Sequence, residues 1–132
     1  MIIKTREGPY REFSLFGARF RVLLPREKSE STEIIEESWP PGSEAPLNVH
    51  AEMEQLYFVL SGHAHVIIDN ENGELEAGDI ALIPRGAHHM VKNVGEEDLR
   101  YLCFDIFPSG CPNGEETWEA HERVILERFA SG

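Results

Sequence analysis

The sequence predicts an all-β fold, an antiparallel sandwich or barrel, with a polar N-terminal arm and a helical C-terminal tail. Short apolar runs follow one another between residues 13 and 107, and turn-forming residues separate them. Only the tail shows the longer apolar spacing of a helix. The chain has 132 residues, of which 41% are hydrophobic, so residues 1–132 are expected to form one domain with its own core.

The first forty residues predict a polar arm, two short apolar runs and a strand. The arm is expected to run from residue 1 to about residue 12. Residues 13–16 and 20–24 are short apolar runs, and residues 32–39 alternate well enough for a strand. Pro40 and the proline after it end this strand, because proline has no backbone N–H to donate.

The middle of the chain predicts a rapid series of short strands with glycine and proline between them. An Asn72–Gly73 pair predicts a tight hairpin turn, because both residues tolerate positive φ. The strands are expected at residues 47–51, 56–60, 64–68, 80–83, 89–94 and 99–107.

The tail, from about residue 112 to residue 132, predicts a helix over residues 115–130. Its apolar side chains have imperfect helical spacing, so a helix followed by a final strand fits the pattern as well. In both cases we expect the tail to cover the body of the barrel.

Charge and cysteine content exclude several classes of function. With 12 Lys and Arg against 24 Asp and Glu, the net charge is −12, which disfavours binding to nucleic acid or to an anionic membrane. The start of the chain lacks the apolar region of a signal peptide, and no run is long enough to span a membrane. The two cysteines, Cys103 and Cys111, are too few for a disulfide framework. We therefore expect a cytoplasmic protein with reduced thiols, a bridge between these two cysteines being the minor alternative.

Five of the six histidines lie between His50 and His89. Asn48 shares a strand face with His50, because residues two apart point to the same side. Gln55 can join them from the next strand, and His89 can supply a fourth donor. Imidazole nitrogen and amide oxygen suit Fe²⁺, Mn²⁺, Co²⁺, Ni²⁺ or Zn²⁺. The pattern predicts a divalent transition-metal site.

Two glycine-rich patterns surround these donors. The pattern G-x5-P-x-G-x2-H-x3-N is matched at every fixed position, by Gly78, Pro84, Gly86, His89 and Asn93. The pattern G-x5-H-x-H-x3–4-E-x6-G keeps its spacing but has two amides in place of His and Glu, the residues being Gly42, Asn48, His50, Gln55 and Gly62. Over residues 39–108 the chain therefore resembles the cupin family, which has these two motifs.

The resemblance implies a double-stranded β-helix, a jelly-roll-like barrel, which holds a divalent metal through Asn48, His50, Gln55 and His89. It also implies a small-molecule substrate or ligand and a homodimer formed through the sheets. A neutral ligand set should bind metal more weakly than one with a carboxylate. It leaves the ion its full charge, which favours an anionic or enediol-type substrate.

Other polar residues compete for places in the site. Glu52 and Glu54 are alternatives to Gln55 as the oxygen donor. Tyr57 shares the face of Gln55 and is a candidate hydrogen-bond donor or acid. Asp105 lies in an apolar run and is a second catalytic candidate, with Cys103 and Tyr101 on the same face. The remaining histidines are expected to point away from the site, these being His63, His65, His88 and His121.

Three hypotheses on function follow. The first is a metal-dependent enzyme acting on a small organic molecule, of dioxygenase or of isomerase/lyase type. The second is a non-catalytic cupin that binds a sugar-like or other small ligand, with a structural metal or none. The third, a storage or scaffold role, is the weakest, because the second motif is matched so completely.

Overall fold

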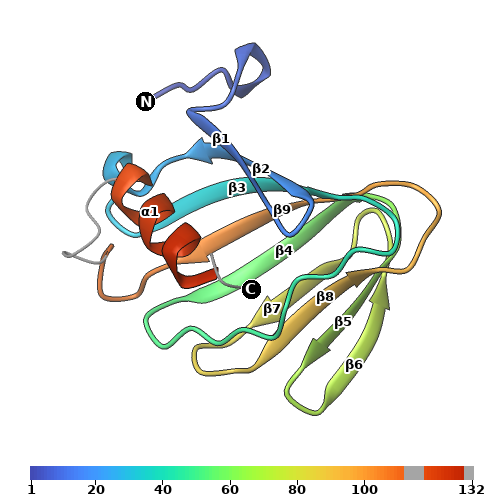
Figure 1. The fold of residues 1–132 in the computed structure, drawn as a ribbon. Helices are drawn as coiled ribbons and strands as arrows, with labels where there is room; N and C mark the ends of the chain where they lie inside the picture. The colour runs from blue at the N-terminus through green and yellow to red at the C-terminus, as the bar shows by residue number, and fades with distance from the viewer. Residues whose placement is uncertain (112–117, 130–132) are drawn as a thin grey trace.

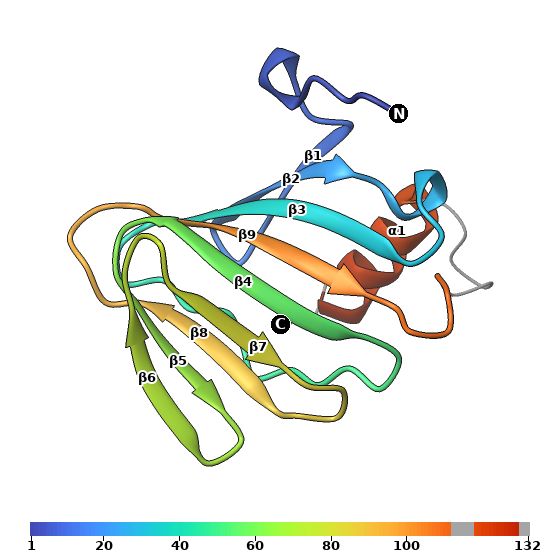
Figure 2. The ribbon, with the colours of Figure 1, turned by 180° about the vertical axis from the view of Figure 1, so that it is seen from behind.

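Two antiparallel sheets form the barrel (Figures 1 and 2). The computed structural model describes residues 1–111 and 118–129, and within them nine strands are found. The larger sheet has the order β1 (Arg11–Leu15), β2 (Ala18–Leu24), β3 (Thr32–Trp39), β9 (Leu99–Ile106), β4 (Glu54–Ser61), β7 (Ile80–Ile83). The smaller sheet has the order β6 (Glu71–Leu75), β5 (Ala64–Ile68), β8 (His89–Asn93). The predicted all-β, jelly-roll-like fold is confirmed.

The inner face of the larger sheet carries polar as well as apolar side chains. In β3 the buried positions alternate strictly with less buried ones, as the sequence pattern predicts. Two of the four buried side chains are acidic, however, namely Glu33 and Glu37 beside Ile35 and Trp39. In β9, which pairs with β3 in full register, Asp105 is buried in the same way. The interior is therefore suited to holding a polar ligand as well as to packing.

The turn between β5 and β6 corrects the sequence prediction. Ile68 pairs with Glu71, so the turn residues are Asp69 and the asparagine after it, and Gly73 lies inside β6. Asp69 has a φ of 49°, and its amide donates to the carbonyl of His88 at 2.7 Å. Its Oδ1 accepts a bond from the His88 amide at 2.9 Å. These two contacts with a distant segment override the local preference for a turn at Asn72–Gly73.

Two other predictions about the strands need correction. Residues 47–51 do not form a strand, and only the isolated pairing of Asn48 with His89 is present. The two backbone hydrogen bonds of that pair are both 2.9 Å, which is enough to hold Asn48 beside the start of β8.

The polar arm is also shorter than predicted, because β1 already begins at Arg11. A short 3-10 helix, η1 (Thr5–Glu7), lies within the arm, and a second one, η2 (Arg26–Lys28), follows β2.

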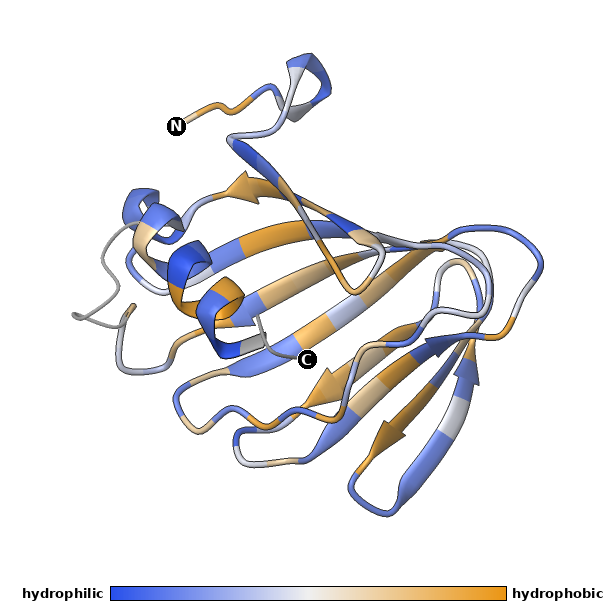
Figure 3. Ribbon diagram, viewed as in Figure 1, coloured by the Kyte–Doolittle hydropathy of each residue, from blue (hydrophilic) through white to orange (hydrophobic). Residues whose placement is uncertain are grey.

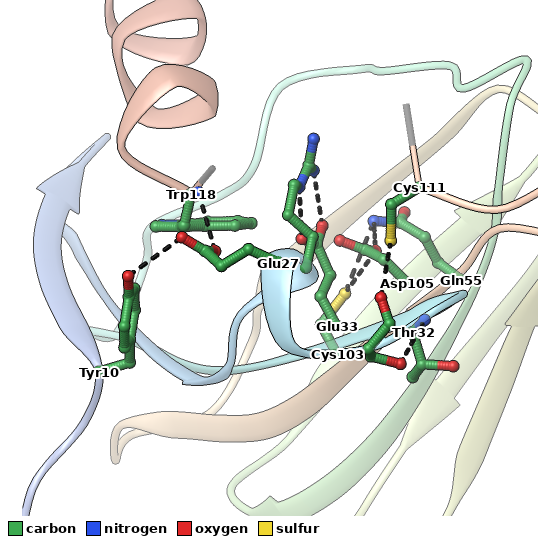
Figure 4. A network of polar contacts seen from close by, with 11 residues as sticks. Tyr10, Glu27, Thr32, Glu33, Gln55, Cys103, Asp105, Cys111 and Trp118 are labelled. Atoms are coloured by element: carbon green, nitrogen blue, oxygen red, sulfur yellow. Dashed lines mark hydrogen bonds and ion pairs between the residues drawn. The ribbon is translucent and has the colours of Figure 1, made fainter. Parts of the chain in front are cut away.

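The helix α1 (Trp118–Phe129) lies across the larger sheet, in front of it in Figure 1 and behind it in Figure 2. The other parts of the predicted tail, residues 112–117 and 130–132, lie outside the described residues. Glu27 anchors the first turn of α1, because its Oε1 accepts from the Trp118 amide at 3.0 Å (Figure 4). Arg11 of β1 bonds to Glu122 at 2.6 Å, which ties α1 to the edge of the sheet.

The two edges that face away from α1 differ in polarity. Figure 3 shows that β6 is mostly hydrophilic and β7 mostly hydrophobic. Polar residues on an edge strand oppose pairing with another chain, so of these two edges the one formed by β7 is the apolar one.

Cys103 and Cys111 are both free, as predicted. None of the helices among the described residues is long and apolar enough to cross a membrane.

Candidate functional site

A cavity of about 600 Å³ lies inside the barrel, between the larger sheet and α1. Its polar lining includes the four predicted metal ligands and the two predicted catalytic candidates: Asn48, His50, Gln55, His89, Tyr57 and Asp105. Aromatic side chains form another part of the lining, called here the aromatic wall: Phe13, Phe16, Phe20, Trp39 and Trp118. The cavity therefore combines polar donors with a large apolar surface, as ligand pockets commonly do.

His50 and His89 lie next to each other in this cavity, with ring centroids 5.4 Å apart. His89 is the first residue of β8, and its Nδ1 lies 3.2 Å from the carbonyl oxygen of Ala87. A carbonyl accepts only from an N–H, so the proton of this imidazole is on Nδ1 and Nε2 keeps its lone pair. Burial lowers the pKa of His50 to about 4 and also lowers the pKa of His89. Both rings are neutral at pH 7, which is the form that binds metal.

Asn48 is close to His50, but it presents the nitrogen of its amide. Its Nδ2 is 3.3 Å from Nε2 of His50, while its Oδ1 accepts a hydrogen bond from the Val49 amide at 2.9 Å. An amide nitrogen has no lone pair for a metal ion, so in this orientation Asn48 orients His50. To serve as the predicted ligand, Asn48 would have to turn its amide over.

Gln55 is buried on the inner face of β4, and its amide joins two neighbours. Nε2 donates to Oδ1 of Asp105 at 2.8 Å, and Oε1 accepts from the hydroxyl of Tyr57 at 3.3 Å. An amide oxygen has two lone pairs, so one of them stays available to a ligand. Of the two alternatives, Glu54 is not among the residues that line the cavity, whereas Glu52 is exposed and lines it.

Behind Gln55 lies a buried acidic network (Figure 4). Arg26 donates two hydrogen bonds of 2.8 Å to Glu33, and both side chains are almost completely buried. Burial and the neighbouring Asp105 carboxylate nevertheless raise the pKa of Glu33 to about 9. Glu33 therefore keeps its proton at pH 7. A Glu in place of Gln55 would bring a third acid to this network, which accounts physically for the amide at this motif position.

Glu37 is a cavity residue that the sequence analysis did not identify. Its Oε1 accepts from the Tyr101 hydroxyl at 2.8 Å and from Nε1 of Trp39 at 3.1 Å. Burial raises the pKa of Glu37 to about 7, although these hydrogen bonds oppose the shift. Its place in the sequence could have located it: Glu37 is two residues from Trp39 in the predicted strand, and residues two apart point to the same face.

Tyrosine and cysteine side chains in the cavity stay protonated. Burial raises the pKa values of Tyr57 and Tyr101 well above the usual value, and raises that of Cys103 in the same way. Tyr57 is thus a hydrogen-bond donor at pH 7. Cys103 remains a thiol, so it is no ready nucleophile.

The remaining histidines follow the predictions with one exception. His63 and His65 lie outside the cavity, 3.2 Å from Glu76 and from Asn72 respectively, and His88 is exposed. His121 is the exception: it was expected on the surface, but it is half-buried and lines the cavity. The docking of α1 against the larger sheet places it there, which the sequence spacing alone did not indicate.

The donors present suit a divalent transition metal with few protein ligands. Among the described residues, no cluster of three or more His, Cys, Asp or Glu could hold a metal ion. Any ion in this part of the chain would depend on the pair of neutral imidazoles, with an amide oxygen from Gln55 as a third donor. Nitrogen and oxygen donors of this kind fit first-row divalent ions, and the other positions would be open to water or to a substrate.

Comparisons with known proteins agree with this architecture. The sequence model of the Cupin domain family matches residues 35–105. An uncharacterised protein of Methanocaldococcus jannaschii is 33% identical over 110 residues, which cover 81% of this chain and 88% of that protein.

Two further similarities connect the chain with named proteins. Quercetin 2,3-dioxygenase of Bacillus subtilis is 27% identical over 141 residues, which cover 98% of this chain but only 41% of that protein. The chain therefore spans less than half of that relative's length. The crystal structure of a predicted oxalate decarboxylase from Thermotoga maritima superposes with a TM-score of 0.71 at 24% identity, covering 81% of this chain and 99% of that one. The structural similarity supports the fold.

Proposed function

Because the chain belongs to the cupin family, we propose that it binds a divalent transition metal in the barrel cavity and acts there on a small organic molecule. His50 and His89 are the principal ligands in this proposal, and Gln55 supplies an amide oxygen. Asn48 orients His50, or becomes a ligand itself if its amide turns over. Fe, Mn, Co, Ni and Zn all suit such donors.

The observation that carries the proposal is the pair of neutral imidazoles in one cavity. Their ring centroids are 5.4 Å apart, and burial lowers the pKa of each ring. No proton has to be removed from either ring before it binds an ion at pH 7. The same cavity has the volume of a small-molecule site.

When bound, the ion supplies Lewis acidity to an oxygen atom of the substrate. The residues of the chain supply the rest of the chemistry. Tyr57, which stays protonated, donates its hydroxyl proton to Oε1 of Gln55 and so orients this amide, while its own oxygen can accept a hydrogen bond from a substrate hydroxyl. Asp105 accepts the Gln55 amide at 2.8 Å and so acts as a positioning residue. Reactions of dioxygenase type and of isomerase or lyase type are both compatible with this arrangement.

Elemental analysis and calorimetry test the metal site. Protein purified without a histidine tag is analysed by mass spectrometry and then titrated with Mn²⁺, Co²⁺ and Zn²⁺ after removal of bound metal. We expect one ion per chain, and the variants His50→Ala and His89→Ala should lose it. His88→Ala is the matched control, because it removes a neighbouring exposed histidine. Failure of the wild type to take up any of these ions, or unchanged binding in both variants, would refute the proposal.

A non-catalytic role in ligand binding is the second candidate. It is favoured by the two amides at the motif positions, whose polar atoms are already hydrogen-bonded within the protein. Oxygen uptake by the Fe²⁺-loaded protein with catechols, diketones or flavonoids separates the two. Uptake that is lost in His50→Ala supports an oxygenase, whereas ligand binding that persists without metal and without turnover supports the second candidate.

We also infer that the chain forms a homodimer through the outer face of β4 and β7. Phe58 pairs with Ile80 in register there, and Leu82 lies beside them on the same face. Their exposed fractions of 37%, 56% and 51% are high for apolar side chains on paired strands. Light scattering at micromolar concentration should give the mass of two chains. Leu82→Glu should give monomers while Leu47→Glu, in a loop, does not; a monomeric wild type would contradict the inference.

A further inference from the structure

The aromatic wall brings together both tryptophans of the chain and three of its seven phenylalanines. Phe13 stacks on Phe20 with centroids 5.0 Å apart and planes 5° apart. Trp39 meets Phe20 edge-on at 5.8 Å, and Trp118 meets Phe13 at 6.3 Å. Phe13, Trp39 and Trp118 belong to the buried core, so the rings of the wall that stay half-buried beside the cavity are those of Phe16 and Phe20.

Phe16 contributes to this wall from a strained backbone position. It is the first residue of the two-residue turn that joins Leu15 to Ala18, and its φ is 56°. Turns of this kind favour asparagine or glycine, and a bulky side chain at positive φ is a true outlier. Such strain persists where the surrounding structure holds it in place, and it collects at ligand-binding sites. The side chain that this strained turn carries lines the cavity.

The cavity-facing side of α1 links the wall to the histidine pair. One side of α1 carries three residues that line the cavity, Trp118, His121 and Arg128. His121 is three residues after Trp118, and Arg128 is seven residues after His121, which are helical spacings. The ring centroids of Trp118 and His121 are 4.8 Å apart. Arg128 thus brings a cationic side chain to the cavity that contains the histidine pair, in a chain whose net charge is −12.

We propose that the molecule taken by this site is an aromatic carboxylate, with its ring against the aromatic wall and its carboxylate between Arg128 and the histidine pair. The inference rests on the proposed function, because it names the class of molecule for the same cavity. A planar ring gains contact with the wall that a saturated ring of the same size does not. The carboxylate gains charge-assisted hydrogen bonds from Arg128, which lines the cavity and is itself exposed.

Tryptophan fluorescence tests the proposal directly, because both tryptophans lie in the wall. The probes are 3-phenylpropanoate and 3-cyclohexylpropanoate, which share a carboxylate and differ in the aromaticity of the ring. We expect saturable changes with both and an affinity about 2- to 10-fold higher for the phenyl compound. Equal affinities, or a preference for the saturated ring, would overturn the proposal.

Two substitutions locate the ring and the carboxylate. Phe16→Leu should reduce the preference for the phenyl compound, whereas Phe104→Leu, the same change at a half-buried residue of β9 that does not line the cavity, should leave it unchanged. Arg128→Gln should weaken both probes about equally, because both carry the carboxylate. An unchanged preference in Phe16→Leu, or unchanged binding in Arg128→Gln, would refute the corresponding half of the placement.

Metal titration keeps this test separate from that of the proposed function. Each probe is titrated into protein loaded with Zn²⁺ and into protein treated with EDTA. If the ions bind and no preference for the phenyl ring is seen, the aromatic class is wrong and the metal site stands. If no ion binds and the phenyl ring is still preferred, the metal-dependent function is wrong and the aromatic class stands.

Discussion

Substitution of Gln55 by Glu tests how the buried acidic network and the metal site depend on each other. Nε2 of Gln55 donates to Asp105 at 2.8 Å, and Asp105 in turn lies beside Glu33, whose pKa it helps to raise. The variant replaces this donor by a carboxylate of nearly the same shape. We expect the metal-free protein to lose stability and the metal-bound protein to recover it.

The magnitude follows from two terms. A hydrogen bond to a charged group contributes about 1.5–3 kcal/mol, and the variant loses the one between Gln55 and Asp105. Two carboxylates about 4 Å apart repel each other by about 4 kcal/mol at the effective dielectric constant of a protein interior. Protonation of one carboxyl group relieves part of this repulsion. A net loss of about 3 kcal/mol in the free energy of unfolding is therefore expected at about pH 8, and a smaller loss at about pH 5.

Urea denaturation of EDTA-treated protein at the two pH values measures this loss. Asn70→Asp is the control, because it adds the same charge at an exposed turn position. With Zn²⁺ present, Gln55→Glu should recover its stability and bind the ion about tenfold more tightly, since the new ligand is anionic. A metal-free variant as stable as the wild type at the higher pH would show that Asp105 does not need the Gln55 amide, and would refute this reasoning.

Three further substitutions probe groups around the cavity. Burial raises the pKa of Glu37 to about 7, so the folded protein keeps a proton that the unfolded chain releases near pH 4.5. This carboxyl should therefore lower the free energy of unfolding by about 3 kcal/mol as the pH rises from about 4.5 to above 7. In Glu37→Gln this pH-dependent loss should disappear, which urea titrations across the pH range measure. Arg26→Met should cost about 1–3 kcal/mol in calorimetry, because the buried Glu33 carboxyl loses its two hydrogen bonds of 2.8 Å, and replacing Glu33 by an apolar residue as well should restore most of the loss. Asp69→Ala should cost about 1–2 kcal/mol in the same assay, because it loses the 2.9 Å bond to the His88 amide at a residue with positive φ; unchanged stability would contradict this anchoring role.

Strand parity made much of the site predictable from sequence. Alternation within a strand is a local property, so His63 and His65 could be assigned to the outside from parity, whereas His50, which lies outside any strand, and His89 needed the spacing of the two motifs as well. The structure places all four as expected. The order of the sheets could be expected only through the resemblance to a family, because strand pairing between distant segments leaves little local signal.

Features that depend on contacts between distant segments were missed. The turn at Asp69 depends on His88, and local turn preferences therefore pointed to the wrong residues. The burial of Glu33 depends on Arg26, which reaches it from η2. His121 lines the cavity only because α1 docks on the larger sheet, which no periodicity within the helix reveals.

The most direct test of the central claim is a crystal of the protein soaked in Mn²⁺ or Zn²⁺, with anomalous scattering recorded on both sides of the absorption edge of the metal. The proposed function requires a single strong peak in the cavity, about 2.0–2.2 Å from an imidazole nitrogen of His50 and of His89. An anomalous peak only at surface residues, or an ion held in the cavity without these two histidines, would contradict it.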